Sequence, residues 1–148
     1  MTQDDDDVVT AFREGRTPPG MHRDRLLLLT TTGRMSGRRH TTPMMRLALP
    51  DADHVVASGN ASPHHPGWYL DVLHDPDVHV EFANGEYDAV AHVLGADERD
   101  NAWNFILQCA PFFADHQRHV ERVIPIIRLE RTPLVLPFSD PLPAVSRR

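Results

Sequence analysis

One segment of the chain, residues 26–43 with the sequence LLLLTTTGRMSGRRHTTP, constrains the fold more than any other. It begins with an apolar run over residues 26–32 that is rich in leucine and threonine, which is typical of a strand buried on both faces. Gly33 and Gly37 then bracket a short basic stretch, and glycine accepts the positive φ angles that tight turns need. An extended segment follows directly. The sequence therefore predicts a β-hairpin with a cationic tip.

The tip of this hairpin carries Arg34, Arg38 and Arg39. Backbone N–H groups of a glycine-containing turn can converge on an anion, and arginine side chains add charge and directed hydrogen bonds. Two interpretations stay open at this point. Either the turn holds a phosphate-like group, or it is a solvated loop whose arginines only keep it hydrated, which is the more common role of short basic stretches.

Composition narrows the classes of function. The chain has 148 residues, enough for one domain with its own core, and its 15 basic residues, all arginine, face 21 acidic ones for a net charge of -6. This balance argues against general nucleic-acid binding. Cys109 is the only cysteine and the longest apolar run is too short to span a bilayer, so we expect a cytoplasmic protein without disulfides or stable membrane insertion.

Hairpin connections outnumber crossovers along the chain, which favours an antiparallel barrel with appended helices over a doubly wound parallel sheet. Asn84-Gly85 is a strong two-residue hairpin signal. We expect three parts, namely a flexible acidic leader over residues 1–22, a β-barrel domain over residues 23–132 and a proline-rich tail over residues 133–148. The predicted strands cover residues 26–32, 40–49, 54–58, 78–82, 87–94 and 123–129, with a short helix over 67–74 and a single long helix over 97–113.

The ten histidines suggest a metal centre, but their spacing matches no established metal motif. Only His116 and His119 would share a helical face, so we predict no metal site. A hydrolase is not indicated either, since no Gly-x-Ser-x-Gly sequence occurs. Cys109 lies on the apolar stripe of the predicted long helix, where we expect it to be buried and inert.

An aromatic pair lies within residues 63–73, PHHPGWYLDVL, beside the glycine-containing loop of residues 59–66. Trp68 and Tyr69 can wall a flat ligand or pack in the core, and their residue types do not decide between the two. A basic turn, a loop with special backbone geometry and an aromatic pair, each at a strand end, are together typical of a site for a phosphorylated planar cofactor at a barrel mouth.

These motifs, in this order, resemble the deazaflavin (coenzyme F420)-dependent nitroreductase family of split-β-barrel oxidoreductases. The resemblance covers about residues 26–130 and includes TTTGRMSGRRHTTP, VVASGNASPHHPGWYLDVLHDPDVHV, PFFADHQ and IPIIRLE. It implies a mainly β (α+β) fold, an antiparallel split β-barrel of the flavin-reductase and PNPOx-like type, with one long and one or two short helices. It also implies that coenzyme F420 is the cofactor, with FMN or no cofactor as the alternative.

In family members, a Gly-Arg-Lys-Ser-Gly turn binds the phosphate and glutamyl tail of the coenzyme, and an Ala-Ser-Lys-Gly-Gly stretch lies beside its ring. The residues that match these two motifs by position are Arg34, Ser36, Gly37, Ala57 and Ser58. The resemblance places Ser58 beside the ring, and our hypothesis makes Tyr69 a proton donor or substrate-orienting residue. These two are the candidate catalytic residues. The complete candidate coenzyme site consists of Arg34, Met35, Ser36, Gly37, Arg38, Arg39, His40, Pro43, Ala57, Ser58, Gly59, Asn60, Ala61, His65, Trp68 and Tyr69.

Some positions depart from the family pattern. Two lysines are replaced by Met35 and Gly59, an arginine by His40, and Gly-Gly by Asn60-Ala61. Three cationic positions are therefore weakened or lost, which would lower the affinity for the coenzyme by roughly a hundredfold or more if nothing compensated. Arg38 and Arg39 can compensate, as can His40 when it is protonated.

The main hypothesis is a reductase that transfers a hydride from reduced coenzyme F420 to an electron-poor small molecule, such as an enone, a quinone or a nitro compound. We expect it to work as a monomer or homodimer. The alternative is a family member that has lost the coenzyme and acts as a hydrophobic-ligand-binding barrel or as a cofactor-independent biosynthetic isomerase or cyclase.

Overall fold

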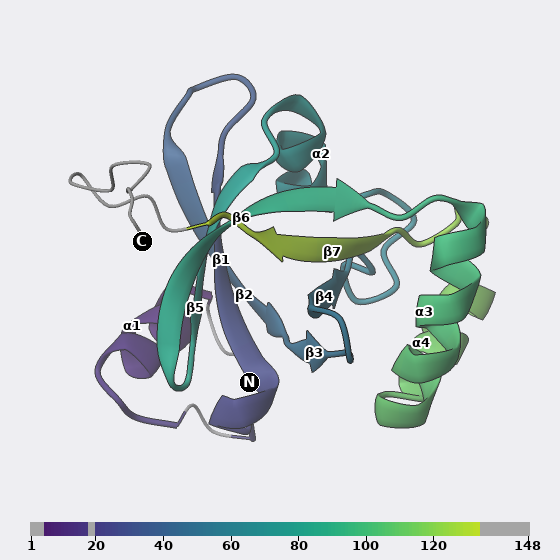
Figure 1. The fold of residues 1–148 in the computed structure, drawn as a ribbon, viewed down its shortest axis with the longest axis horizontal. Coiled ribbons are helices and arrows are strands. Elements are labelled where there is room, and N and C mark those ends of the chain that lie inside the picture. The colour runs from purple at the N-terminus through teal and green to yellow at the C-terminus, as the bar shows by residue number, and fades with distance from the viewer. Residues whose placement is uncertain (1–4, 18–19, 134–148) are drawn as a thin grey trace, which may run out of the picture.

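A seven-stranded antiparallel sheet forms the body of the molecule in the computed structural model, which describes residues 5–17 and 20–133 (Figure 1). The order of strands in the sheet is β2-β1-β5-β6-β7-β4-β3. This confirms the predicted antiparallel, barrel-like fold with appended helices. The strands are β1 (Leu26–Thr32), β2 (Arg39–Met45), β3 (Leu47–Ala48), β4 (Asp53–Val56), β5 (Asp77–Phe82), β6 (Gly85–Val93) and β7 (Ile126–Arg131). The helices are α1 (Asp5–Arg13), the 3-10 helix η1 (Arg23–Arg25), α2 (Gly67–His74), α3 (Ala96–Cys109) and α4 (Phe112–His119).

The β1–β2 hairpin is present with the predicted first strand. β1 pairs antiparallel with β2 from Leu26 opposite Met45 to Thr32 opposite Arg39. Leu27 packs in the core cluster inside the curled sheet, whereas Leu28 packs against α1. Both faces of β1 are therefore buried, which explains why the strand has consecutive leucines and no alternation of apolar and polar residues.

A single continuous segment of the chain forms both edge strands of the sheet, β2 and β3. β2 and β3 are consecutive in sequence and are separated by Arg46 alone, yet they lie at opposite ends of the strand order. The predicted single strand over residues 40–49 is therefore bent in two. The N–H group of Arg46 still donates to the carbonyl of Arg25 (2.9 Å), next to the pair of Leu26 and Met45, whereas Leu47 already pairs with His54 of β4. The two edges of the sheet are thus joined covalently, which curls it into a barrel.

The predicted single helix over residues 97–113 is wrong at its carboxyl end. The helix stops at Cys109, Ala110 has φ −144° and ψ 73°, and a new helix follows Pro111. Proline disfavours the helical conformation in the residue before it and lacks a donor N–H group, so the break falls where Pro111 requires it. The expected burial of Cys109 is also wrong, because the last turn of α3 leaves it exposed.

No helix within residues 5–17 and 20–133 is long and apolar enough to cross a membrane. The longest of them, α3, has 14 residues. The two helices α3 and α4 lie together at one end of the molecule, on the side opposite to α1 (Figure 1).

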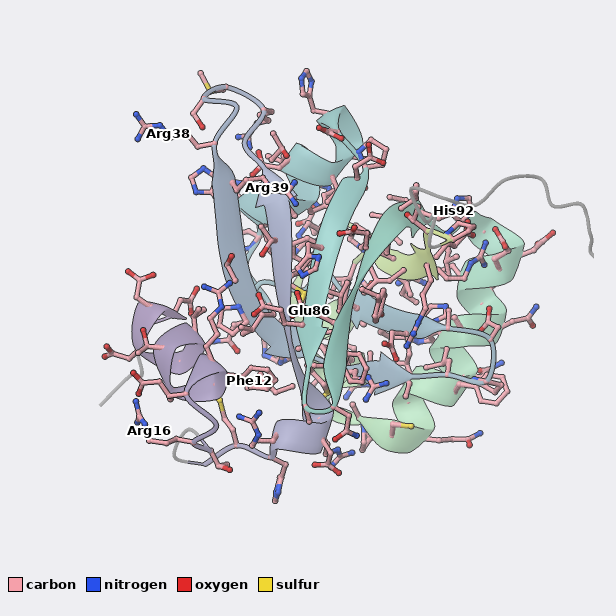
Figure 2. All side chains as sticks on the ribbon, turned by 60° about the vertical axis from the view of Figure 1, so that its left-hand side comes forward. Phe12, Arg16, Arg38, Arg39, Glu86 and His92 are labelled. Carbon is pink, nitrogen blue, oxygen red and sulfur yellow. The ribbon has the colours of Figure 1, made fainter. Side chains whose placement is uncertain are left out.

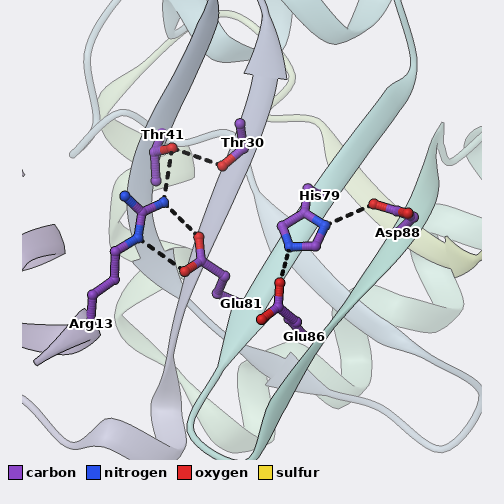
Figure 3. A network of polar contacts seen from close by, with 7 residues as sticks. All are labelled: Arg13, Thr30, Thr41, His79, Glu81, Glu86 and Asp88. Atoms are coloured by element: carbon purple, nitrogen blue, oxygen red, sulfur yellow. Dashed lines mark hydrogen bonds and ion pairs between the residues drawn. The ribbon is translucent and has the colours of Figure 1, made fainter. Parts of the chain in front are cut away.

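The segment expected to be a flexible leader is, over Asp5–Arg13, a helix that packs on the sheet. Val8 and Phe12 are buried against Leu28 of β1. Arg13 adds a two-pronged ion pair with Glu81 of β5, with Nε and Nη2 donating over 3.0 and 2.7 Å (Figure 3). Burial of the apolar face of α1 explains this attachment. The domain boundaries remain a prediction, and the tail lies outside the described residues from position 134 onward.

The Asn84-Gly85 hairpin between β5 and β6 is also as predicted, with Phe82 opposite Gly85. On its surface the ring of His79 lies between Asp88 and Glu86, at 2.7 Å from each (Figure 3). Partial burial opposes the charge of this ring, but the two carboxylates outweigh it and raise the pKa of His79. The protonated ring can donate to both acidic groups at once, which ties the two strands together.

The loop that follows β4 has a left-handed backbone at three consecutive residues. The φ angles of Gly59, Asn60 and Ala61 are 59°, 57° and 63°. The N–H group of Ala61 donates to the hydroxyl of Ser58 (3.0 Å), and the N–H group of Ser62 donates to the carbonyl of Gly59 (3.2 Å). Glycine and asparagine tolerate this conformation, but for alanine it costs about 1 kcal/mol or more.

Replacing Ala61 by glycine should therefore raise the free energy of unfolding by about 1 kcal/mol, because the strain at this position disappears. Urea denaturation of the two proteins measures the difference. The matched control is Ala114→Gly inside α4, which should lower the free energy of unfolding by about 1 kcal/mol, since glycine weakens a helix interior. Equal destabilisation by both changes would show that Ala61 carries no strain.

Candidate active site

A cavity of about 550 Å³ lies beside β2 and is lined in part by predicted site residues. Its walls come from β2, the end of β4, the loop after β4, the start of α2, α4 and the first residue of α1. The lining brings together five predicted site residues, Pro43, Ser58, Gly59, Asn60 and Trp68. It also contains residues that the sequence analysis did not assign to a site, namely Asp5, Thr42, Met44, Met45, Val56, Pro66, Phe113 and His116.

A smaller hollow of about 190 Å³ lies inside the turn between β1 and β2. It groups a second set of predicted residues, namely Arg34, Met35, Ser36 and His40. The N–H group of Gly33 donates to the carbonyl of Arg38 (2.8 Å), and that of Gly37, at φ 72°, donates to the carbonyl of Gly33 (2.9 Å). Nine of the sixteen predicted site residues therefore line one of these two hollows, which β2 joins.

Arg34 is engaged by the protein itself. Its backbone N–H group and its guanidinium Nη1 both donate to Oδ1 of Asp71 on α2, over 3.1 and 2.8 Å. Asp71 is buried, so this ion pair fixes the turn against α2 and offsets the charge of Arg34. Met35 at the tip is 91% exposed.

Arg38 and Arg39 carry the charge that the turn presents to solvent. Arg38 projects outward from the hairpin tip, whereas Arg39 lies closer to the strands (Figure 2). Arg39 donates one hydrogen bond to the hydroxyl of Thr32 (2.9 Å). In the part of the chain that the structure describes, the guanidinium of Arg38 has no hydrogen-bond partner and Arg39 has no acidic one. Both can bind an anion at the end of β2.

Arg122 holds the loop that forms one wall of the cavity. Its guanidinium donates to the carbonyls of Ala57 (3.2 Å), Ser58 (2.8 Å) and Ser62 (3.1 Å), and it lies 3.2 Å from Nδ1 of His65. Burial and then the charge of Arg122 lower the pKa of His65, which keeps that ring neutral. Ala57 and His65 thus support the loop from behind, and neither lines the cavity.

Ser58 and His116 form a polar pair in the cavity wall. Ser58 is buried, and its Oγ lies 2.6 Å from Nδ1 of His116 while it accepts a hydrogen bond from the N–H group of Ala61. In one neutral tautomer the hydroxyl donates to Nδ1 and the ring proton is on Nε2, whereas in the other tautomer Nδ1–H donates to the hydroxyl oxygen. Phe112 and Phe113 pack on the same ring, at centroid distances of 5.4 and 5.5 Å.

Tyr69 lies in the core behind Trp68. It is buried, its ring packs against His65 at a centroid distance of 4.8 Å, and it meets Trp68 edge-on at 6.5 Å. Burial raises the pKa of Tyr69, and nearby Arg122 opposes part of that effect. Of the predicted aromatic pair, the structure therefore places Trp68 in the cavity wall and Tyr69 in the packing that supports it.

Among the described residues, no three His, Cys, Asp or Glu side chains are grouped closely enough to hold a metal ion. His116, considered as a ligand on spacing, instead bonds to Ser58. His119 is exposed and bonds to the carbonyl of Asp115 one turn earlier.

The two hollows fit a planar molecule with an anionic tail. Trp68 and Met44 supply apolar surface for a flat ring, and Ser58 supplies a polar contact. β2 leads from this cavity to the turn that carries Arg38 and Arg39, where charge-assisted hydrogen bonds can hold an anion.

Comparison with known proteins agrees with this geometry. The model of the family "F420H(2)-dependent quinone reductase" matches residues 6–131. An F420H(2)-dependent quinone reductase of Mycobacterium tuberculosis is 30% identical over 108 residues, which cover 71% of this chain and 72% of the relative. The solved F420-H2 dependent reductase FDR-A is 32% identical with a TM-score of 0.67, covering 75% of this chain and all of that one.

A more distant solved structure shows the breadth of the fold. A protein of Listeria innocua assigned as a pyridoxamine 5′-phosphate oxidase is 12% identical, with a TM-score of 0.51 over 87% of this chain and 94% of its own. The predicted split β-barrel, the deazaflavin-dependent family and coenzyme F420 are all confirmed. The chain belongs to the F420H(2)-dependent quinone reductase family and is an F420-dependent reductase.

Proposed function

We propose that this reductase acts on a quinone or a similar electron-poor small molecule in the cavity beside β2. The observation that carries the proposal is the cavity itself, where an aromatic wall at Trp68 faces the same space as the Ser58–His116 pair. The names of the relatives point to quinones as the first substrates to test. An enone or a nitro compound would need the same features, namely a flat pocket and a donor for the developing negative charge.

The coenzyme would be held at both ends of β2. Trp68 and Met44 would flank the deazaflavin ring, and Arg38 and Arg39 would bind the anionic tail. Each charge-assisted contact of this kind is worth about 1.5 to 3 kcal/mol, so two arginines can offset the lost lysines at positions 35 and 59. When bound in its reduced form, coenzyme F420 supplies the hydride.

The protein must then supply a proton, because a quinone that accepts a hydride becomes a hydroquinone anion. His116 is suited to this role, since in the tautomer whose Nδ1 accepts from Ser58 its Nε2 carries a proton. Ser58 is held in turn by the N–H group of Ala61. We assign the proton transfer to His116, and we assign to Tyr69, the earlier candidate, a supporting position behind Trp68.

The purified protein should oxidise reduced coenzyme F420 when 2-methyl-1,4-naphthoquinone is added, because both reactants fit the neighbouring walls of one cavity. The return of the fluorescence of oxidised coenzyme measures the rate. A control without quinone sets the background from oxygen. Tight coenzyme binding with no quinone-dependent oxidation would refute the proposed substrate class.

Arg38→Ala and Arg39→Ala should each raise the Kd of coenzyme F420 roughly tenfold, because each removes one charge-assisted contact at an exposed site. Fluorescence titration at low and at moderate salt measures this, and salt should weaken the wild-type protein more than either variant. Arg16→Ala is the matched control, since Arg16 is an exposed arginine far from the hairpin tip (Figure 2). If Arg16→Ala weakens binding equally, the effect comes from net charge and not from this turn.

His116→Gln should lower kcat about a hundredfold and leave the Kd of the coenzyme within twofold of wild type. Glutamine can keep a hydrogen bond to Ser58, but it cannot donate a proton to an anionic product. His119→Gln, three residues further along α4 and exposed, is the control and should leave kcat unchanged. An unaltered kcat in His116→Gln would exclude His116 as the proton donor.

A further inference from the structure

A cavity of about 330 Å³, the α3 cavity, lies between helix α3 and the turn that joins β3 to β4. It shares no lining residue with the candidate active site or with the hollow inside the arginine turn. Its apolar walls come from Leu49, Pro50, Leu94, Ala102 and Phe105. The ring of Phe105 is 47% exposed, so it is open to contact by a bound molecule. A volume of this size is typical of a site for a small molecule.

A buried histidine gives the α3 cavity a hydrogen-bond acceptor. His54 lines the cavity and is only 2% exposed, and its Nδ1 lies 3.0 Å from the carbonyl oxygen of Ala52. Because a carbonyl oxygen can only accept, Nδ1 carries the ring proton and donates it. Burial lowers the pKa of His54, which keeps the ring neutral. Nε2 of this ring therefore carries a lone pair.

The lone pair on Nε2 of His54 is unpaired within residues 5–17 and 20–133. It is not sealed in the core, because in that part of the chain Oγ1 of Thr31 is the one buried side-chain polar atom without a partner. The α3 cavity is thus the open space that Nε2 meets. An unpaired acceptor in a largely apolar wall favours a ligand that donates a hydrogen bond, since leaving the acceptor unpaired costs free energy.

The charged groups of the α3 cavity favour a cation. Asp51 and Glu98 bring two carboxylates, against the single guanidinium of Arg128. The guanidinium donates to Glu98 over 2.9 Å and to Glu130 over 2.9 and 2.7 Å, so its donor groups are occupied. Among the described residues, the carboxylate of Asp51 has no ion-pair partner. A negative charge therefore lies beside the apolar wall.

We propose that the α3 cavity is a second small-molecule site, which binds a small aromatic amine in its ammonium form. An N–H group of the ligand donates to Nε2 of His54, the carboxylate of Asp51 balances the positive charge, and the aromatic ring packs against Phe105. The site does not depend on the reduction proposed above, because the two cavities have no wall in common.

Three probes with the same ring test the chemistry of this site. They are 2-phenylethylamine, the neutral 2-phenylethanol and the anionic 3-phenylpropionate. Calorimetric titration at neutral pH should give the amine a Kd of about 1 mM or lower, with each of the other two at least about tenfold weaker. The nitrogen NMR resonance of His54 Nε2 should shift along the same binding curve. Equal binding of the amine and the alcohol, or no shift at Nε2, would overturn the proposal.

Variants at two exposed residues test the walls of the α3 cavity without disturbing the core. Asp51→Asn and Phe105→Ala should each raise the Kd of 2-phenylethylamine at least about fivefold, because one removes the balancing charge and the other the packing surface. Asp24→Asn in η1, at an exposed acidic residue outside the cavity, is the matched control and should leave the Kd unchanged. An unchanged Kd in both wall variants would overturn the site.

His54→Phe removes the acceptor and keeps an aromatic ring at this position. It should abolish binding of 2-phenylethylamine, with thermal unfolding as the check on the fold, and the two wall variants decide the question if this protein does not fold. Saturating amine should leave the Kd of coenzyme F420 within twofold of its usual value. Competition between the two ligands, with an unchanged amine Kd in Asp51→Asn, would place the amine beside β2 and overturn the proposal.

Discussion

The ion pair between Arg46 and Asp53 fixes the bend on which the barrel depends. Arg46 is the single residue between β2 and β3, and its Nε donates to Oδ1 of Asp53 over 3.0 Å. The other carboxylate oxygen accepts from the hydroxyl of Tyr87 over 2.6 Å, and burial together with this bond raises the pKa of Tyr87. The guanidinium also lies over the ring of Phe82 at 4.6 Å. Because Asp53 is buried, loss of either ionic partner would leave the other charge poorly compensated.

The bend between β2 and β3 also positions residues that line the cavity beside β2. It sends β2 to one end of the strand order and β3 to the other, so that Met44 and Met45 come to face the end of β4 across the cavity. A second arginine, Arg122, then fixes the loop after β4 by three carbonyl contacts. Neither Arg46 nor Arg122 lines the cavity. The two arginines shape a ligand site from outside it, by holding backbone segments in position.

The loop held by Arg122 also explains one departure from the family pattern. At Gly59, φ is positive and an added Cβ would lie 3.1 Å from Cγ of Pro66. A lysine at this position would therefore be strained in the present backbone. The glycine at position 59 therefore suits the left-handed backbone of this loop better than the lysine of the family pattern does. Ala61 adopts the same left-handed conformation without being glycine, so its backbone is strained.

Much of the fold could be predicted from local patterns in the sequence. The leucine run of β1, the Asn84-Gly85 turn and the helix before Pro76 each carry their own signal. The break at Pro111 had one too, since the residue before a proline avoids helical geometry. The packing of α1 could also have been inferred, because a strand that is apolar on both faces needs a cover on each.

The site was less accessible to sequence analysis, because its polar members meet only through tertiary structure. Ser58 and His116 are 58 positions apart, and Arg122 reaches Ser58 across 64. No periodicity or short motif links residues at such separations. The motif residues themselves were found, but their roles depend on neighbours, as Arg34 shows by pairing with Asp71 instead of facing the turn alone.

The charge distribution along β2 gives the site a direction. Arg38 and Arg39 lie at the first end of β2. At its last end, Met45 lines a cavity together with Asp5 of α1. A strand of seven residues separates these ends by about 20 Å, and among the described residues the arginines at the first end have no acidic partner, so that end favours an anion. In the proposed function these arginines would orient a coenzyme with a charged tail before any specific contact forms. In the proposed arrangement its ring would lie in the cavity beside Met44 and Trp68, away from the arginine turn.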